Sequence, residues 1–442
     1  MSELDNYLDD MKDEDKNEFD DIFAKDEAKD VTNGITLSDE QQAAFDTCIN
    51  SKERIFILTG RPGTGKTTLA FWLLQHYLEE TQGSVALCAP TGRAAKRLSE
   101  KTGHRATTIH RLLKWQPMGG FKYNETLKLA HKVIVCDESS MIDLFLFNSL
   151  LKAIPSNCKL ILSGDPYQLP PVGPGAPFRD LINSNVVPCF ELMEIHRQAA
   201  DNRIIATAHA ILDGDYEAIS WDGERKDFQI IEKTDEEYIV DYIEQEITFA
   251  KHKYGVKPNE VQVLTPMHKG LVGTKALNER FQATFNPPLS SKREFISGFN
   301  TFREGDRIIQ MKNDYELDVF NGDLGIISNI YQGADVKHEG LLQIRFDDRE
   351  EPVQLENTEQ VNRINLAYAL TVHKSQGSEY PLVIIPCHST HTWMWRRPLI
   401  YTAVTRAQKY CVLVGDTSVM TKAIQDNRDD ERQTYLKQRI RG

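Results

Sequence analysis

The chain has 442 residues, of which 40% are hydrophobic and 26% are charged, which is typical of a globular protein with more than one domain. No stretch holds the roughly 18 apolar residues that a membrane span needs, and the N-terminus is acidic where a secretory signal is basic. We therefore expect a cytoplasmic protein without membrane association. The seven cysteines form no C-x-x-C pair, which argues against a zinc or iron–sulfur centre.

The negative charge gathers at the start of the chain. Residues 1–30 contain 13 acidic residues and 4 lysines, a balance of −9, so the rest of the chain carries only −4 of the net −13. Because local patches set the attraction to phosphates, the total charge does not exclude nucleic-acid binding. We expect residues 1–34 to be an acidic disordered tail. It is either a solubilising segment or, through Phe19, Ile22 and Phe23 at helical spacing, a contact for a protein partner.

The stretch 54–69, RIFILTGRPGTGKTTL, predicts a buried strand, a glycine-rich turn and the start of a helix. The glycines let backbone N–H groups point inward, and with the positive end of the helix these amides suit an anion. The spacing G-x-x-x-x-G-K-T predicts that Lys66 reaches the β- and γ-phosphates of a nucleotide and that Thr67 holds Mg²⁺. The predicted nucleotide-binding residues of this turn are Gly60, Gly63, Thr64, Gly65, Lys66, Thr67 and Thr68.

Two later strands end in polar side chains that complete such a site. The strand 133–136 delivers Asp137, predicted to hold Mg²⁺ through its water shell, and Glu138, predicted to orient and deprotonate the attacking water. The strand 160–163 leads into a turn that ends at Gln168. We expect Gln168 to contact the γ-phosphate and to report its loss.

Phosphoryl transfer also requires positive charge against the transition state. The candidate arginine fingers are Arg197 in ELMEIHRQ and Arg406 in YTAVTRAQ, and such residues are worth about 10³ to 10⁵ in rate. Both follow the first set of strands. If they reach the nucleotide, it lies in a cleft between two domains, and its turnover would open and close that cleft as in a motor.

The order of elements predicts the α/β class. Helices alternate with apolar runs at 55–59, 85–89, 133–136 and 160–163, and a second set of strands follows at 261–265, 382–386 and 412–415. This alternation predicts two parallel sheets covered by helices. Gly119 and Gly120 between aromatic residues predict a hairpin inserted in the first domain. Short alternating strands around Asn321 and Gly322 predict a small all-β insert in the second.

Eleven stretches, in order along residues 36–416, resemble the motifs of superfamily 1 helicases, and specifically the RecD-like group of the 1B branch. They are LSDEQQAAF, GRPGTGKTT, APTGRAAKRL, TTIHRLL, DESSM, GDPYQLPPVGPG, EIHRQ, VLTPMHKGLVGTKALN, FNGDLGII, LTVHKSQGSEYPLVIIP and YTAVTRAQKYCVLVGD. The resemblance implies a RecA-like motor domain over 35–190, with a duplex-splitting pin hairpin at about 112–131. A second RecA-like motor domain is expected over 191–442, with a small β-barrel at about 303–358. It also implies a short form that lacks the large N-terminal domain found in many RecD-like proteins.

The resemblance assigns further residues. Gln41 is expected to read the adenine edge, and Gly377 is grouped with the nucleotide-binding residues. Hydroxyl, imidazole and guanidinium groups that grip phosphates without reading sequence are expected to line the track for single-stranded DNA. These residues are Thr91, Arg93, Thr108, His110, Thr371, His373 and Ser375. Trp393 and Trp395, beside Arg396 and Arg397, either stack on bases or belong to the core.

The expected activity is that of an ATP-dependent DNA helicase that uses Mg²⁺, translocates 5′→3′ on single-stranded DNA and unwinds duplex junctions in replication, recombination or repair. The direction follows from the family resemblance alone. Three alternatives stay open: a DNA-stimulated ATPase that acts as a translocase or docking subunit of a recombination or replication assembly, an RNA-directed helicase, and a translocase that strips proteins from DNA.

Overall fold

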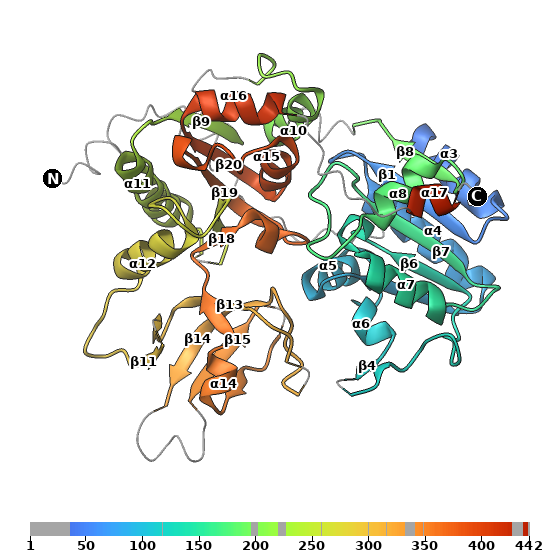
Figure 1. Cartoon of the computed structure of the whole chain (residues 1–442), viewed down its shortest axis with the longest axis horizontal. Coiled ribbons are helices and arrows are strands. Elements are labelled where there is room, and N and C mark those ends of the chain that lie inside the picture. The colour runs from blue at the N-terminus through green and yellow to red at the C-terminus, as the bar shows by residue number, and fades with distance from the viewer. Residues whose placement is uncertain are drawn as a thin grey trace. The chain divides into compact units, whose positions relative to one another are not determined.

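The computed structural model describes residues 36–440 except 117, 196–201, 220–226, 258, 299, 315, 332–340, 348 and 427–435. The chain forms two compact units, and the division falls between His209 and Ala210 (Figure 1). We call the described residues 36–209 with 436–440 the first unit and residues 210–426 the second unit. The predicted boundary at 190/191 stays a prediction, and the tail 1–34 lies outside the described residues. No helix in the described ranges is long and apolar enough to cross a lipid bilayer.

The first unit is built on a six-stranded sheet whose strand pairs are all parallel, in the order β3-β2-β6-β7-β1-β8. Side chains of one strand alternate between the two faces, so Phe56 and Leu58 pack in one core cluster and Ile57 in the other. The strands are β1 (Ile55–Gly60), β2 (Val85–Ala89), β3 (Ala106–Thr108), β6 (Val133–Cys136), β7 (Lys159–Gly164) and β8 (Cys189–Leu192).

Helices cover both faces of this sheet, which explains why its strands are continuous apolar runs. The helices α3 (Asp39–Asn50), α4 (Lys66–Glu80) and α5 (Gly92–Thr102) bury Ala44, Leu73 and Leu98 in one cluster. On the opposite face, α6 (Ile109–Leu112), α7 (Leu144–Ala153) and α8 (Pro177–Ser184) contribute to the other cluster. The short α17 (Leu436–Ile440) packs on α8.

The inserted hairpin of the first unit consists of two short strands. β4 (Trp115–Gln116) and β5 (Gly120–Phe121) pair antiparallel, with Trp115 opposite Phe121. Met118 in the turn is fully exposed, at 100%. The base of the hairpin is anchored, because the rings of His110 and Phe121 lie 5.6 Å apart between centroids and Phe121 packs against the buried core.

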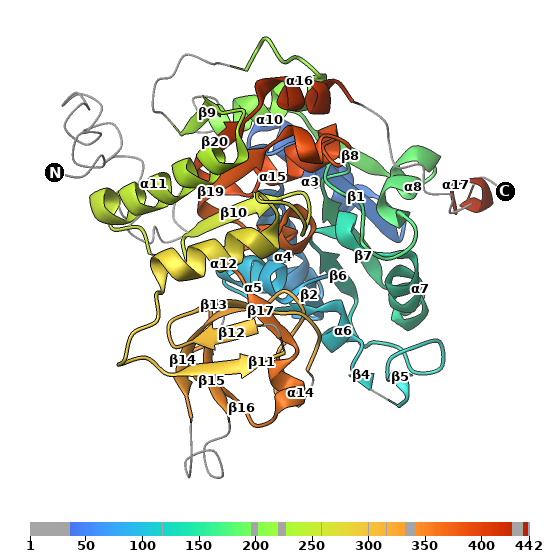
Figure 2. The same ribbon diagram turned by 60° about the vertical axis from the view of Figure 1, so that its left-hand side comes forward.

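The second unit contains a five-stranded parallel sheet in the order β18-β10-β19-β20-β9. Figure 2 shows α11 (Glu236–Tyr254) and α12 (Thr274–Phe285) side by side over this sheet, and α15 (Arg397–Val404) and α16 (Thr417–Gln425) also pack on β19. α10 (Arg203–Asp213) spans the division between the units. The strands are β9 (Phe228–Glu232), β10 (Val261–Thr265), β18 (Ala369–Thr371), β19 (Tyr380–Cys387) and β20 (Ala407–Gly415).

The all-β insert lies in the chain between α12 and β18. A hairpin of β11 (Glu294–Ser297) and β12 (Asn300–Arg303) precedes a five-stranded antiparallel sheet in the order β16-β15-β14-β13-β17. Phe302, Ile327 and Phe346 belong to its own buried core. The strands of that sheet are β13 (Arg307–Gln310), β14 (Leu324–Ile330), β15 (Leu342–Phe346), β16 (Val353–Leu355) and β17 (Ile364–Leu366), and α14 (Thr358–Val361) precedes β17. The predicted α/β class, with a hairpin in the first parallel-sheet unit and a β insert in the second, is confirmed.

Candidate active site

The glycine-rich turn after β1 is closed too tightly for other residues. Gly63 and Gly65 have left-handed backbones, with φ of 79° and 77°, a region that glycine adopts without strain. A Cβ atom on Gly60 would lie 2.7 Å from Oγ1 of Thr64. That hydroxyl donates a hydrogen bond of 2.8 Å to the carbonyl oxygen of Arg61. The loop therefore has the shape of a backbone cradle.

The start of α4 has the chemistry that an anion requires. Its N-cap is Gly65, which makes no side-chain capping bond, and its first turn carries no acidic residue. The uncapped amides at a helix N-terminus attract negative charge. Lys66 Nζ is held within the turn, where it donates hydrogen bonds to the carbonyls of Gly60 at 2.6 Å and Arg61 at 3.1 Å. Thr67 and Thr68 lie half-buried in the same first turn.

Gln41 connects α3 to this cradle. Its Oε1 accepts a hydrogen bond from the backbone N–H of Ser38 at 3.1 Å, as the second half of a capping box. Its Nε2 donates to the carbonyl of Thr64 at 3.3 Å. The side chain is 2% exposed. The structure thus places Gln41 against the nucleotide loop, and its role in reading adenine stays a prediction.

Asp137 and Glu138 follow β6 and are both 7% exposed. Ser163 on the neighbouring β7 donates its hydroxyl to Oδ1 of Asp137 at 2.9 Å, and Nη2 of Arg97 on α5 lies 3.2 Å from Oε1 of Glu138. Burial and the adjacent Glu138 charge raise the pKa of Asp137, whereas Arg97 and the Ser163 hydroxyl lower it. The sequence reasoning missed both Arg97 and Ser163. Arg97 lies in the motif APTGRAAKRL and Ser163 in the predicted strand 160–163, but nothing in the sequence says which residue each one contacts.

Gln168 lies in the turn after β7 and is 8% exposed. Its Nε2 donates to Oδ2 of Asp165 at 3.4 Å, while its buried Oε1 meets no hydrogen-bond partner among the described residues. A buried acceptor of this kind costs free energy unless a donor forms a hydrogen bond with it. Phosphate oxygens are themselves acceptors, so the missing partner of Oε1 is a donor such as a water molecule, whereas the Nε2 amide is the group that can donate to a phosphate oxygen.

Arg61 in the loop has neighbours that the sequence did not indicate. Its guanidinium carbon lies 5.9 Å from the ring centroid of Tyr167, and its Nη1 lies 3.3 Å from Nδ1 of His209. The hydroxyl of Tyr167 in turn donates to Glu191 at 3.2 Å. Arg61 of the loop is therefore held by residues that are distant from it in sequence.

Four predicted DNA residues lie in the first unit. Thr91 caps α5 by accepting from the Ala94 N–H at 3.3 Å, and Thr108 caps α6 by accepting from the Arg111 N–H at 3.2 Å. Thr108 ends β3, and Thr91 follows the adjacent parallel strand β2, so both threonines lie at one sheet edge. A capping hydroxyl still has its own O–H to donate to a phosphate. Arg93 lies in the first turn of α5, and burial lowers the pKa of His110.

The second unit holds the other predicted residues. Thr371 ends β18, His373 is exposed, and Ser375 is fully buried with its hydroxyl donating to the carbonyl of Val372 at 2.8 Å. Arg406 is 2% exposed and donates to the carbonyls of Thr402 at 3.1 Å and Ser378 at 3.2 Å. It therefore lies beside Gly377, whose φ is 73°.

Arg197 lies outside the described residues. Trp393 is 66% exposed, whereas Trp395 is 2% exposed and belongs to the core.

Three family models match consecutive parts of the chain. The AAA domain matches residues 36–233, the SH3 domain of ATP-dependent RecD-like DNA helicases matches 277–346, and the UvrD-like helicase C-terminal domain matches 366–414. The RecBCD enzyme subunit RecD of Mycolicibacterium smegmatis is 30% identical over 440 residues, which cover 91% of this chain and 75% of that subunit. The chain belongs to the RecD-like helicases of superfamily 1B.

Two further similarities describe this RecD-like chain. The ATP-dependent RecD2 DNA helicase of Deinococcus radiodurans is 39% identical over 407 residues, or 92% of this chain, and the chain spans only 52% of that protein's length. The crystal structure of a Bacteroides Pif1 helicase in complex with ADP-AlF3 and ssDNA has a TM-score of 0.53 at 18% identity, and the match covers 88% of this chain and 94% of that one. At this identity the likeness shows the fold, which is that of two RecA-like domains. The predicted family and fold are confirmed.

Proposed function

We propose that this chain is an ATP-dependent DNA helicase that translocates 5′→3′ on single-stranded DNA and unwinds duplex ahead of it. The observation that carries the proposal is one arrangement in the first unit. The phosphate cradle with Lys66 follows β1, the pair Asp137 and Glu138 follows β6, and Gln168 follows the strand between them in the sheet. The helicase relatives support the choice of DNA as the substrate, and the direction follows from membership of the family.

Each residue of this arrangement has a role in hydrolysis. Lys66 exchanges its two loop carbonyls for oxygens of the β- and γ-phosphates of ATP, and the loop amides hold the same oxygens. Thr67 and Asp137 would hold Mg²⁺, which when bound neutralises charge on those phosphates. Glu138 accepts the proton of the attacking water at its carboxylate, while Arg97 holds that carboxylate in place. Gln41 and Gly377 contact the nucleotide, and Arg197 and Arg406 supply positive charge to the transition state.

The DNA track uses side chains that contact phosphates without reading bases. In the first unit the capping hydroxyls of Thr91 and Thr108 lie at one sheet edge. The full set in our proposal is Thr91, Arg93, Thr108, His110, Thr371, His373 and Ser375. Of these, Ser375 is buried and donates its hydroxyl to the carbonyl of Val372, so in our proposal it holds the turn that carries His373.

The test uses two partial duplexes that differ only in carrying a 5′ or a 3′ single-stranded overhang. We expect unwinding of the 5′-tailed substrate alone, and Lys66→Ala to lower ATP turnover by about 10²-fold or more because it removes a positive charge that acts on the transferring phosphate. Lys96→Ala, in the same unit and paired with Glu100 on the surface, is the matched control. Preference for the 3′-tailed substrate would contradict the proposal, and a third duplex with a 5′ RNA overhang tests the RNA alternative.

A second candidate is a DNA-stimulated translocase or docking subunit of a larger assembly. It is favoured by the 30% identity to the RecBCD enzyme subunit RecD. If DNA stimulates ATP hydrolysis while neither tailed duplex opens, this second candidate replaces the first.

The hairpin gives a separate prediction about strand separation. Trp115→Ala together with Met118→Ala should lower unwinding about tenfold and leave translocation nearly unchanged. A pin that compensates for the free energy of separating one base-pair step contributes about 1.4 kcal/mol, which corresponds to a factor of about ten in rate. Phe121 is left intact because its ring contacts His110. Unwinding is measured on the 5′-tailed duplex and translocation by displacement of streptavidin from a single strand. Phe145→Ala, which removes an aromatic ring that is 69% exposed, is the control, and equal loss of both activities would argue against a pin.

Arg97 gives a prediction about pH. Its charge lowers the pKa of Asp137, so Arg97→Gln should raise that pKa and protonate Asp137 at higher pH. The acid limb of the profile of ATP turnover against pH should therefore move toward higher pH, because a protonated carboxyl no longer attracts a metal ion. Lys96→Gln on the same helix should leave the limb in place. An unchanged limb in Arg97→Gln would show that Arg97 acts on Glu138 alone.

A further inference from the structure

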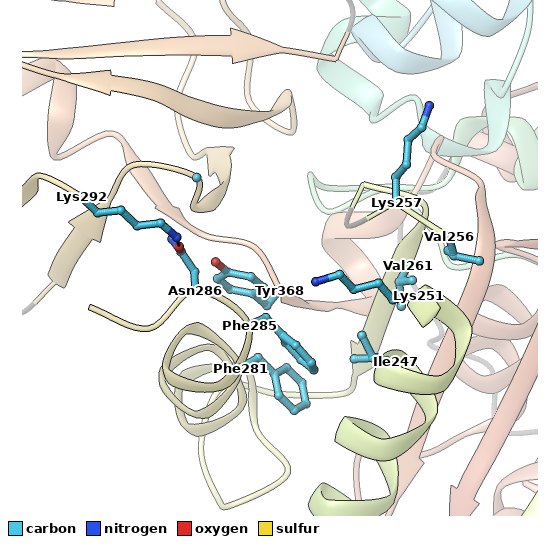
Figure 3. Close-up of a pocket in the computed structure, with 11 residues that line it drawn as sticks. Ile247, Lys251, Val256, Lys257, Val261, Phe281, Phe285, Asn286, Lys292 and Tyr368 are labelled. Atoms are coloured by element: carbon cyan, nitrogen blue, oxygen red, sulfur yellow. Dashed lines mark hydrogen bonds between the residues drawn. The ribbon is translucent and has the colours of Figure 1, made fainter. Parts of the chain in front are cut away.

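The second unit contains a cavity of about 210 Å³ that the proposed function does not use. It lies where α11 and α12 meet the beginning of the β insert, and Figure 3 shows the rings of Phe281 and Phe285 on one side and Ile247 on the other. Val256, Val261 and Tyr368 also contribute to the apolar part of the lining. A cavity of about 150 Å³ is large enough to hold benzene, so this one admits a phenyl ring.

The rim of the cavity is positively charged. Its lining contains Lys251, Lys257 and Lys292 and no acidic residue, and Figure 3 shows Lys251 extending from α11 toward Tyr368. Lys292 donates to Oδ1 of Asn286. Lys251 and Lys257 are exposed residues, and neither side chain forms an ion pair with another residue that the structure describes. Figure 3 shows Lys257 extending away from the rings of Phe281 and Phe285, so its charge lies outside the apolar floor. An apolar floor inside a cationic rim suits a ligand with an aromatic side chain flanked by carboxylates.

The chain itself carries a segment with this chemistry. Within the acidic residues 1–30, Phe19 stands between Glu18 and the pair Asp20 and Asp21, and Ile22 and Phe23 follow. The segment lies outside the described residues. We propose that the cavity rimmed by Lys251, Lys257 and Lys292 binds the acidic–aromatic segment 18–23 of the same chain. An aromatic ring enters the apolar floor, and the flanking carboxylates meet the lysines.

Because the segment and the cavity belong to one chain, even a weak contact is enough to keep the cavity occupied. A flexible linker supplies an effective concentration of about 1 mM, so a segment whose free peptide has a Kd of about 100 µM would occupy its site about nine-tenths of the time. The tethered segment would then raise the apparent Kd of a competing free peptide about tenfold. The apparent Kd of a free peptide therefore shows whether the cavity is occupied by the chain's own segment or is empty.

The first experiment titrates a fluorescein-labelled peptide of residues 13–27 with the full chain and measures fluorescence anisotropy. The variant Phe19→Ala with Phe23→Ala should bind the peptide about tenfold more tightly than the wild type, because its own segment no longer competes. In that background, Lys251→Glu with Lys257→Glu should weaken peptide binding at least about tenfold. The matched control is Lys253→Glu with Lys275→Glu, which reverses two charges on α11 and α12 away from the lining and should change the Kd less than about twofold.

The second experiment places a photo-crosslinking phenylalanine analogue at position 19 of the full chain. We expect intramolecular crosslinks to α11, α12 or Tyr368, located by mass spectrometry, and their loss in Lys251→Glu with Lys257→Glu. Thermal melting verifies that each variant is folded. Equal peptide affinity in the wild type and the tail variant, equal binding of a scrambled peptide, or crosslinks elsewhere in the chain would each overturn the proposal. Crosslinks between chains that vanish on dilution would assign the cavity to the tail of a second copy instead.

Discussion

Replacing Glu138 with glutamine is expected to lower ATP turnover by about 10² to 10⁴-fold, which is the usual contribution of a positioned general base. Glutamine has nearly the same shape, and its amide oxygen still accepts a hydrogen bond from Arg97, which now lies 3.2 Å from the carboxylate. The amide cannot take a proton from water at neutral pH. Nucleotide affinity should change little because the cradle and Lys66 are untouched. Phosphate release at saturating single-stranded DNA measures ATP turnover, and fluorescence of a bound nucleotide analogue measures nucleotide affinity.

The matched control for this experiment is Glu100→Gln. Glu100 lies on α5 in the same unit and is paired on the surface with Lys96 at 3.8 Å, so its loss should leave turnover within about twofold of the wild type. If ATP turnover by Glu138→Gln also stays within about threefold of the wild type, Glu138 is not the general base. In that case the buried carboxylate pair would serve only to bind metal.

Replacing Asp306 with asparagine is expected to lower the free energy of unfolding of the second unit by about 4 kcal/mol, from two or more unsatisfied buried groups. Asp306 is fully buried, and its two oxygens accept four hydrogen bonds. The donors are Gln282 Nε2 at 2.5 Å, Asn286 Nδ2 at 2.7 Å, the Arg303 N–H at 2.7 Å and the Tyr368 hydroxyl at 2.9 Å. In asparagine one acceptor becomes an NH₂ group, which cannot accept a hydrogen bond from the N–H donors that it faces.

This network joins α12, the start of the β insert and the residue before β18. Burial raises the pKa of Asp306, and the hydrogen bonds oppose that rise. The loss of stability is measured by denaturant unfolding of the full chain, with hydrogen exchange to locate it in α12 and β13. Asp241→Asn, which removes an exposed carboxylate paired with Arg280 at 3.1 Å, is the control and should cost under about 1 kcal/mol. A similarly small loss in Asp306→Asn would mean that the network rearranges around the amide.

The glycine-rich loop after β1 could be predicted because its conformational requirements fall on neighbouring residues. Gly63 and Gly65 are needed for left-handed backbone, Lys66 begins the helix, and all lie within one turn of chain. The same holds for Asp137 and Glu138 at the end of an apolar run, and for the alternation of strands and helices that predicts parallel sheets. In each case the physical constraint acts between residues close in sequence, so the pattern can be recognised from the sequence alone.

Other parts of the site depend on contacts between distant residues. Arg97 meets Glu138, Ser163 meets Asp137 and Gln41 meets Thr64 only because the strand order β3-β2-β6-β7-β1-β8 brings their elements together. The donors around Asp306 likewise come from the end of α12, the start of the β insert and the residue before β18. The sequence by itself determined the glycine-rich loop and the polar residues at the strand ends that we propose to hold a nucleotide, since local backbone geometry and side-chain chemistry decide these features. Only the tertiary structure decided which partners orient those groups, because many strand orders and side-chain pairings are compatible with the same local pattern.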